Sequence, residues 1–151
     1  MPQLVLVHPQ IPPNTGNIAR TCAATDTELH LVGPLGFEIG DRHLKRAGLD
    51  YWPHVKLSFY PDLEHFLQAQ ATRGGRLLGY SVRGTSQYTE FTYQDDDWLL
   101  FGSETQGLPA ELLQRCDATL TIPINKTHVR SLNLSVSAAV GLFEVRRQLG
   151  L

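Results

Sequence analysis

Cysteine is scarce in this sequence, and patterns that could hold a metal ion are missing. The two cysteines, Cys22 and Cys116, form neither a disulfide framework nor a C-x-x-C pair, which fits a reducing compartment. The six histidines are scattered without an H-x-H or H-x-x-x-H pattern. No zinc or iron site is indicated, so we expect two buried thiols and no metal.

Long apolar runs and an excess of positive charge are also lacking. No stretch approaches the roughly 20 apolar residues that span a bilayer, and the first residues lack the basic start of a signal peptide. The 13 Lys and Arg residues against 15 Asp and Glu residues give a net charge of -2. Because binding to nucleic acid by charge usually needs a positive surplus, any such partner must be held by local patches. We expect a soluble, cytoplasmic protein with no membrane partner.

The length of 151 residues suits a single domain, residues 1–151. Apolar β-branched runs predict strands at 3–8, 29–32, 55–59, 77–82, 98–101 and 118–124. Helical patterns predict helices at 15–26, 41–48, 61–71, 109–116 and 131–149. This alternation predicts an α/β fold, with a mostly parallel sheet and helices on both faces.

The predicted helix at 131–149 is apolar on two sides. One stripe contains Leu132, Val136, Ala139, Val140 and Phe143, and a second contains Leu134, Ala138, Leu142, Val145 and Leu149. In a single domain only one side can face the sheet. We therefore expect a homodimer through this C-terminal helix, with the second stripe left for the partner subunit.

The first of three polar segments covers residues 12–22, between the first strand and a helix. We expect Pro12-Pro13 to end the strand and Asn14 or Thr15 to cap the helix. Helix N-termini after parallel strands bind anions through free N–H groups, and Arg20 could reach a phosphate there. Taken by itself, such a segment is more often a helix cap followed by a surface arginine.

The second polar segment, residues 101–109, follows a strand at the edge of the sheet where open α/β folds bind ligands. Gly102 and Gly107 have P-loop spacing, but Leu108-Pro109 stands where a P-loop requires Lys and then Ser or Thr. An ATPase is therefore not indicated, and without a G-x-G-x-x-G after the first strand neither is a dinucleotide site. Two interpretations remain: glycines that let the backbone approach a small ligand, or a tight turn between strand and helix.

The third polar segment, residues 122–135, joins a strand to the last helix. Ser131 is a natural cap for that helix. Asn133 and Ser135 then fall in its first turn, where apolar residues would pack better. These polar side chains indicate either a binding site or a hydrogen-bonded helix end.

Together and in this order, the three segments resemble the motifs of the SPOUT superfamily of S-adenosylmethionine-dependent RNA methyltransferases. The matching patterns are P-x-N-x-G-N-I-x-R, F-G-x-E-x-x-G-L-P, and I-P-I followed by S-L-N-L-S. The stretches 34–37, 44–51 and 93–95 are similar to a compact group that methylates the wobble nucleotide of tRNA, cytidine or modified uridine 34. The resemblance covers essentially the whole chain, and we expect no additional RNA-binding domain before the first strand.

The resemblance implies a homodimer whose C-terminal segment forms a deep trefoil knot around the pocket for S-adenosylmethionine (AdoMet). The residues expected at AdoMet are Tyr80, Gly102, Glu104, Gly107, Ile122, Ser131 and Asn133. Backbone groups are expected to make most of these contacts. Glu104 is expected to order the second-motif loop, and Tyr80 stands where a smaller aliphatic residue is usual.

The resemblance also implies transfer of a methyl group to a ribose 2′-hydroxyl of tRNA, which leaves S-adenosylhomocysteine and needs no metal. Arg20 matches the residue assigned to catalysis in this superfamily. Because a guanidinium normally stays protonated, we expect Arg20 to polarise the 2′-oxygen and hold the adjacent phosphate rather than act as a base. Asn14 and Asn17 are expected to help hold the ribose and phosphate, while Arg42 and Arg46 form a patch for tRNA.

Three alternatives stay open at this point. A SPOUT enzyme could methylate another tRNA or rRNA position, or the chain could be an RNA-binding module without catalysis. The intact Arg20, Gly102 and Ser131 argue against a module without catalysis. A Ser or Cys hydrolase is poorly supported because the sequence has no G-x-S-x-G pattern.

Overall fold

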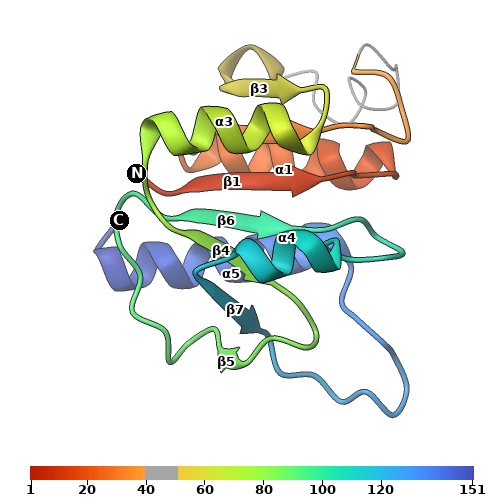
Figure 1. Cartoon of the computed structure of the whole chain (residues 1–151), viewed down its shortest axis with the longest axis vertical. Coiled ribbons are helices and arrows are strands. Elements are labelled where there is room, and N and C mark those ends of the chain that lie inside the picture. Colours follow the sequence, from red (N-terminus) through yellow and green to blue (C-terminus); the bar gives the residue numbers. More distant parts are fainter. Residues whose placement is uncertain (40–50) are drawn as a thin grey trace.

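The computed structural model describes residues 1–39 and 51–151, which form a seven-stranded sheet (Figure 1). The strands are β1 (Gln3–Val7), β2 (Leu29–Val32), β3 (Leu57–Tyr60), β4 (Leu77–Tyr80), β5 (Ser86–Gln87), β6 (Trp98–Phe101) and β7 (Ala118–Thr121). They are ordered β3-β2-β1-β6-β4-β7-β5, and each neighbouring pair runs parallel. The predicted parallel sheet is confirmed. The short strand β5 escaped prediction because two residues carry no periodic pattern.

Helices cover both faces of the sheet, as the alternating pattern predicted. They are α1 (Pro12–Ala24), α3 (Leu63–Arg73), α4 (Ala110–Arg115) and α5 (Leu134–Leu149), with a 3₁₀ turn, η1 (Trp52–His54). α1 and α5 lie on one face, and α3 and α4 on the other (Figure 1). Leu4 and Leu6 of β1 belong to the core under α1 and α5, whereas Val5 and Val7 belong to the opposite core. The helix predicted at 41–48 lies outside the described residues.

α1 begins at Pro12, three residues earlier than the sequence pattern predicted. Pro12 and Pro13 occupy its first positions, where the missing N–H of proline breaks no helical hydrogen bond. Ile11 precedes the helix and provides no side-chain cap. The predicted capping by Asn14 or Thr15 is therefore wrong, because both residues lie buried inside the first turn of the helix.

α5 begins at Leu134, later than predicted, because Asn133 rather than Ser131 caps it. The Asn133 side-chain oxygen accepts hydrogen bonds from the backbone N–H groups of Ser135 (2.8 Å) and Val136 (3.3 Å). The prediction that Ser131 caps the helix is wrong. Residues 122–133 consequently form a loop beside the carboxyl ends of the strands.

The two apolar stripes of α5 are placed the opposite way round from the prediction. The second stripe is core: Leu134, Ala138, Leu142 and Val145 are each 8% exposed or less. The first stripe includes the uncovered side chains, since Val136 is 47% and Phe143 53% exposed. The prediction that the second stripe is left for a partner is wrong, because its side chains pack into the core on the α1 side of the sheet.

Two further features concern membranes and metals. Within residues 1–39 and 51–151, no helix is long and apolar enough to cross a membrane. The same part of the chain has no group of three or more His, Cys, Asp or Glu residues that could hold a metal ion.

Candidate active site

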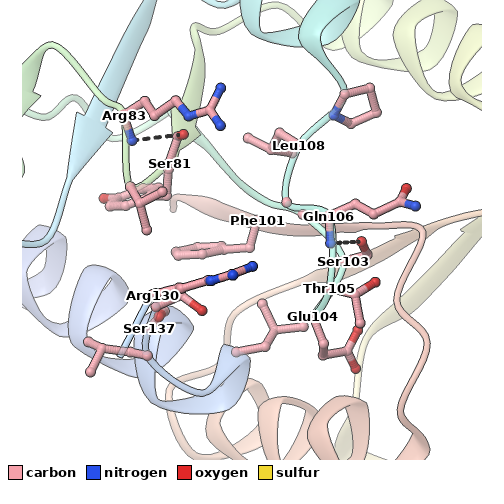
Figure 2. A pocket seen from close by; sticks show the side chains of 18 of the residues that line it. Ser81, Arg83, Phe101, Ser103, Glu104, Thr105, Gln106, Leu108, Arg130 and Ser137 are labelled. Atoms are coloured by element: carbon pink, nitrogen blue, oxygen red, sulfur yellow. Dashed lines mark hydrogen bonds between the residues drawn. The ribbon is translucent and has the colours of Figure 1, made fainter. Parts of the chain in front are cut away.

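A cavity of about 680 Å³ lies at the carboxyl ends of β1, β4, β6 and β7 (Figure 2). Open α/β sheets bind ligands at this edge, and the volume falls in the usual range for small-molecule sites. The predicted site residues on its lining are Tyr80, Gly102, Glu104, Gly107, Ile122 and Ser131. The structure thus brings the second and third motifs together around one cavity.

The second-motif loop, residues 102–109, is a tight turn folded on itself. Gly107 N donates to Ser103 O at 3.0 Å, and Gln106 N donates to Ser103 Oγ at 3.1 Å (Figure 2). A Cβ on Gly102 would lie 1.9 Å from the carbonyl carbon of Gly107, so only glycine fits there. Gly107 has a φ of +69°, which also favours glycine. Of the two interpretations of these glycines, the tight turn is observed: Gly102 makes room for its own loop.

Glu104 ties this loop to the start of α1. Its carboxylate accepts hydrogen bonds from Gln10 N (2.9 Å), Ile11 N (2.7 Å) and Asn14 Nδ2 (3.3 Å). A carboxylate at this position is favourable because it meets free N–H groups and the positive end of the helix dipole. The backbone N–H groups just before α1 are therefore occupied by the protein's own carboxylate.

Two asparagines extend this connection to the third motif. Asn133 Nδ2 donates to Asn14 Oδ1 at 3.0 Å, and Asn14 in turn donates to Glu104. Neither asparagine lines the cavity itself. Because Asn133 also caps α5, the starts of α1 and α5 and the second-motif loop are held together at one point beside the cavity.

Tyr80 and Phe101 form an aromatic part of the cavity lining. Their rings are stacked, with centroids 4.5 Å apart and planes at 14°. The Tyr80 hydroxyl is hydrogen-bonded to that of Tyr93 at 2.9 Å, and burial raises the pKa of Tyr80 well above its usual value. Gly141 of α5 accommodates this large ring, since a Cβ there would lie 3.1 Å from it. Tyr80 is therefore a largely buried, apolar part of the lining, 7% exposed, and not a titrating group.

Arg20 and Asn17 lie outside the cavity lining, on the exposed side of α1. The Arg20 guanidinium lies 5.7 Å from the centre of the Tyr51 ring, which supports it by a cation–π contact. Arg20 is thus not itself a lining residue of the cavity in this chain. Arg42 and Arg46, predicted to bind tRNA, lie outside the described residues.

The cavity residues that the sequence analysis missed include three that can carry a positive charge: His8 after β1, Arg83 after β4 and Arg130 before α5. Figure 2 shows Arg83 and Arg130 reaching toward the cavity from two different loops. Lys126 Nζ donates to Val82 O at 2.8 Å and so joins these loops. The available signal was the place of His8 directly after a strand, because strand ends gather at the ligand edge. The arginines come from loops without such a signal.

Comparison with known proteins identifies the family. The SpoU rRNA Methylase family matches residues 1–143. The chain belongs to the SpoU methylase family. The RNA methyltransferase predicted from the three motifs is thereby confirmed.

Individual members of this family match over nearly the full chain. A Synechocystis protein provisionally named tRNA (cytidine(34)-2′-O)-methyltransferase is 61% identical over 149 residues, 99% of this chain and 97% of that protein. A solved structure concerned with the 2-OH methylation of C/U34 on tRNA has a TM-score of 0.94 at 49% identity, covering 99% of this chain and 97% of that one. An AdoMet-bound rRNA methyltransferase from Sinorhizobium meliloti has a TM-score of 0.89 at 27% identity, over 98% of this chain and 56% of that one.

Proposed function

We propose that this chain transfers a methyl group from AdoMet to the ribose 2′-hydroxyl of nucleotide 34 of tRNA, a cytidine or modified uridine. The observation that carries the proposal is the junction of Glu104, Asn14 and Asn133, where all three motifs meet beside the cavity. The relatives named for methylation at position 34 match nearly the full chain, which supports the same substrate.

The cavity suits AdoMet in size and in chemical character. Tyr80 and Phe101 offer a flat apolar surface to a purine ring, and the 102–107 backbone offers hydrogen-bonding groups. We assign to this ligand Tyr80, Gly102, Glu104, Gly107, Ile122, Ser131 and Asn133, of which Glu104 and Asn133 act by holding the loops in place. When bound, AdoMet supplies an activated methyl group and leaves as S-adenosylhomocysteine.

The protein itself must align the ribose oxygen and lower the cost of removing the hydroxyl proton. Arg20 supplies a fixed positive charge that polarises the 2′-oxygen and holds the adjacent phosphate. Because it lies outside the cavity lining, Arg20 acts on the RNA and not on AdoMet. Asn14 and Asn17 extend this polar surface along α1. Arg42 and Arg46 bind the phosphates of the tRNA backbone. The enzyme carries out this reaction in the cytoplasm.

The direct test is methylation of tRNA by the purified protein with labelled AdoMet, followed by mapping of the labelled nucleotide. We expect label on the 2′-oxygen of nucleotide 34 and none on a matched tRNA with a 2′-deoxynucleotide there. Label at another position would assign the enzyme a different RNA target. Binding of RNA and AdoMet without any transfer would make the chain a binding module.

We also propose a homodimer through the C-terminal helix, with the exposed stripe of α5 at the interface. Val136 and Phe143 leave an apolar surface on α5, next to α1 on the same face of the sheet. Phe143→Glu should give a folded monomer, whereas Leu142→Glu should unfold the chain because Leu142 is 0% exposed. Sedimentation and circular dichroism measure both. A Phe143→Glu protein that stays dimeric would place the interface elsewhere.

We further propose that the C-terminal segment forms a trefoil knot. β5 belongs to the stretch between β4 and β6, yet it pairs with β7 on the side away from β4. Residues 81–97 therefore pass around β7, and α5 returns to pack beside β6 and α1. Such threading is rare, and a crystal structure with a continuous trace through 122–133 tests it. A segment that passes outside the 81–97 loop would contradict it.

A further inference from the structure

Few side chains on the cavity lining carry a group that can accept a proton. In the described part of the chain they are the imidazole of His8 and the carboxylate of Glu104. Both Glu104 oxygens are engaged in holding Gln10, Ile11 and Asn14. The guanidinium groups on the lining stay protonated. The remaining acceptor is His8.

His8 is held in an unfavourable conformation at the carboxyl end of β1. Its φ of +57° lies in the left-handed region, which few residues other than glycine adopt, although asparagine, aspartate and histidine do so more often than the rest. Its backbone N–H donates to Val32 O at 2.9 Å, which anchors the residue there. Backbone strain of this kind persists where the surrounding structure imposes it, and it collects at functional sites.

The His8 ring is also unusual in its hydrogen bonding. Nδ1 is buried and has no hydrogen-bond partner among residues 1–39 and 51–151. Buried polar atoms without a partner are rare and destabilising. The ring borders the cavity, so a strained backbone, an unpartnered nitrogen and access to a ligand coincide at one residue.

We propose that His8 is the catalytic base of the methyl transfer, an inference that rests on the function proposed above. In this assignment, Nε2 of His8 accepts the proton of the ribose 2′-hydroxyl. As the 2′-oxygen bonds to the methyl carbon, the carbon–sulfur bond breaks and its electron pair stays on sulfur. His8 then releases the proton to solvent. This assignment removes from Arg20 a proton-accepting role that a guanidinium fills poorly.

The pH dependence of the reaction must be read with the other charged groups of the cavity in view. These are Glu104 from the β6–α4 loop, Arg83 from the loop after β4 and Arg130 from the loop before α5. Variants of residue 8 retain all three. A difference between their pH profiles and that of the wild type therefore reports on residue 8 itself.

The test replaces His8 by asparagine or by glycine, because both tolerate a positive φ. We expect His8→Gly to raise Tm, and both variants to keep AdoMet and tRNA Kd values within about twofold of the wild type. Single-turnover methyl transfer should fall on the order of 10²-fold, and its pH profile should differ from that of the wild type. Added imidazole should restore part of the rate of His8→Gly. His128→Asn, in a loop outside the cavity lining, is the matched control and should change none of these.

Each outcome separates the two proposals. A wild-type protein that binds AdoMet but does not methylate tRNA would overturn the proposed function. An active wild type with His8→Gly equally fast and with an unchanged pH profile would overturn the role of His8. Loss of Tm or of AdoMet binding together with rate would also overturn it, because His8 would then support the structure or the cofactor site.

Discussion

Two histidines, His30 in β2 and His8 directly after the neighbouring strand β1, have different environments. His30 of β2 is 0% exposed, and its ring nitrogens bond to Tyr60 OH at 3.0 Å and to Gln3 Oε1 at 2.8 Å. Burial lowers the pKa of His30 to about 4. His8, at the other end of β1 from Gln3, has a strained backbone and a buried ring nitrogen without a partner among the described residues. The ring of His30 is thus fully hydrogen-bonded within the protein, whereas His8 lines the cavity with one ring nitrogen unpartnered among the described residues.

The same contrast separates the two ends of the sheet. At the amino end, Arg76 pairs with Asp97 at 2.8 Å and Arg73 with Glu28 at 2.9 Å. At the carboxyl end, Arg83 forms no ion pair with a carboxylate of the described chain, and neither does Arg130. The charged side chains at the amino end are therefore paired within the protein, whereas the guanidinium groups of Arg83 and Arg130 at the carboxyl end are available to a ligand.

The largest expected effect concerns stability at the amino end. The unfolded chain binds a proton at His30 near pH 6.5, but the folded chain does so only near pH 4. The His30 contribution is therefore complete above pH 6.5 and is lost as the pH falls to 4, by up to about 3 kcal/mol. Urea unfolding at stepped pH measures the slope. A His30→Gln protein with the same slope over this window would contradict the assignment.

At the cavity end, Arg20→Ala should affect chemistry and leave stability alone. Methyl transfer should fall on the order of 10²-fold, about 2.7 kcal/mol, with unchanged Tm and AdoMet affinity, because an exposed orienting charge is lost. Single-turnover kinetics and calorimetry give both values. Arg73→Ala at the amino end is the matched control and should retain full activity. Loss of AdoMet binding in Arg20→Ala would contradict the proposal that Arg20 acts on the RNA and not on the cofactor.

Glu104→Gln should lower both stability and activity, because Glu104 lies at the cavity end of the sheet and also stabilises the structure. The change removes the charge from the hydrogen bonds to Gln10 N and Ile11 N, at an expected cost of about 2 kcal/mol in unfolding free energy. Urea unfolding measures this loss, and methylation should fall with it. Unchanged stability would show that this carboxylate does not hold the loop to α1.

The smallest expected effect separates two roles of Asn133. Asn133→Ala removes the α5 cap and should cost about 1 kcal/mol of unfolding free energy. Asn133→Asp keeps a capping oxygen but cannot donate to Asn14, so it should restore stability without restoring full methylation. If the aspartate variant is as active as the wild type, the link between the first and third motifs is not needed for catalysis.

The parts of the fold that were predicted are those with local patterns. Buried runs such as Leu29–Val32 and Trp98–Phe101 identified strands at the positions observed, because a buried parallel strand is apolar throughout. The start of α1 was misplaced because the chain just before it, at Gln10 N and Ile11 N, is held by Glu104, more than 90 residues away in sequence. The stripes of α5 were interchanged because both are apolar, and composition alone does not say which one meets the sheet.

The sequence by itself determined the parallel α/β class and the RNA methyltransferase family, since both depend on hydrophobic periodicity and on short ordered motifs. Only the tertiary structure decided that Gly102 serves its own loop, that Asn14 joins Glu104 to Asn133, and that His8 borders the cavity. The physical reason is that hydrogen bonds and shared cavities depend on distance in space. Asn14 and Asn133 are 119 positions apart in the chain but 3.0 Å apart between their side-chain atoms, and no local pattern records such a contact.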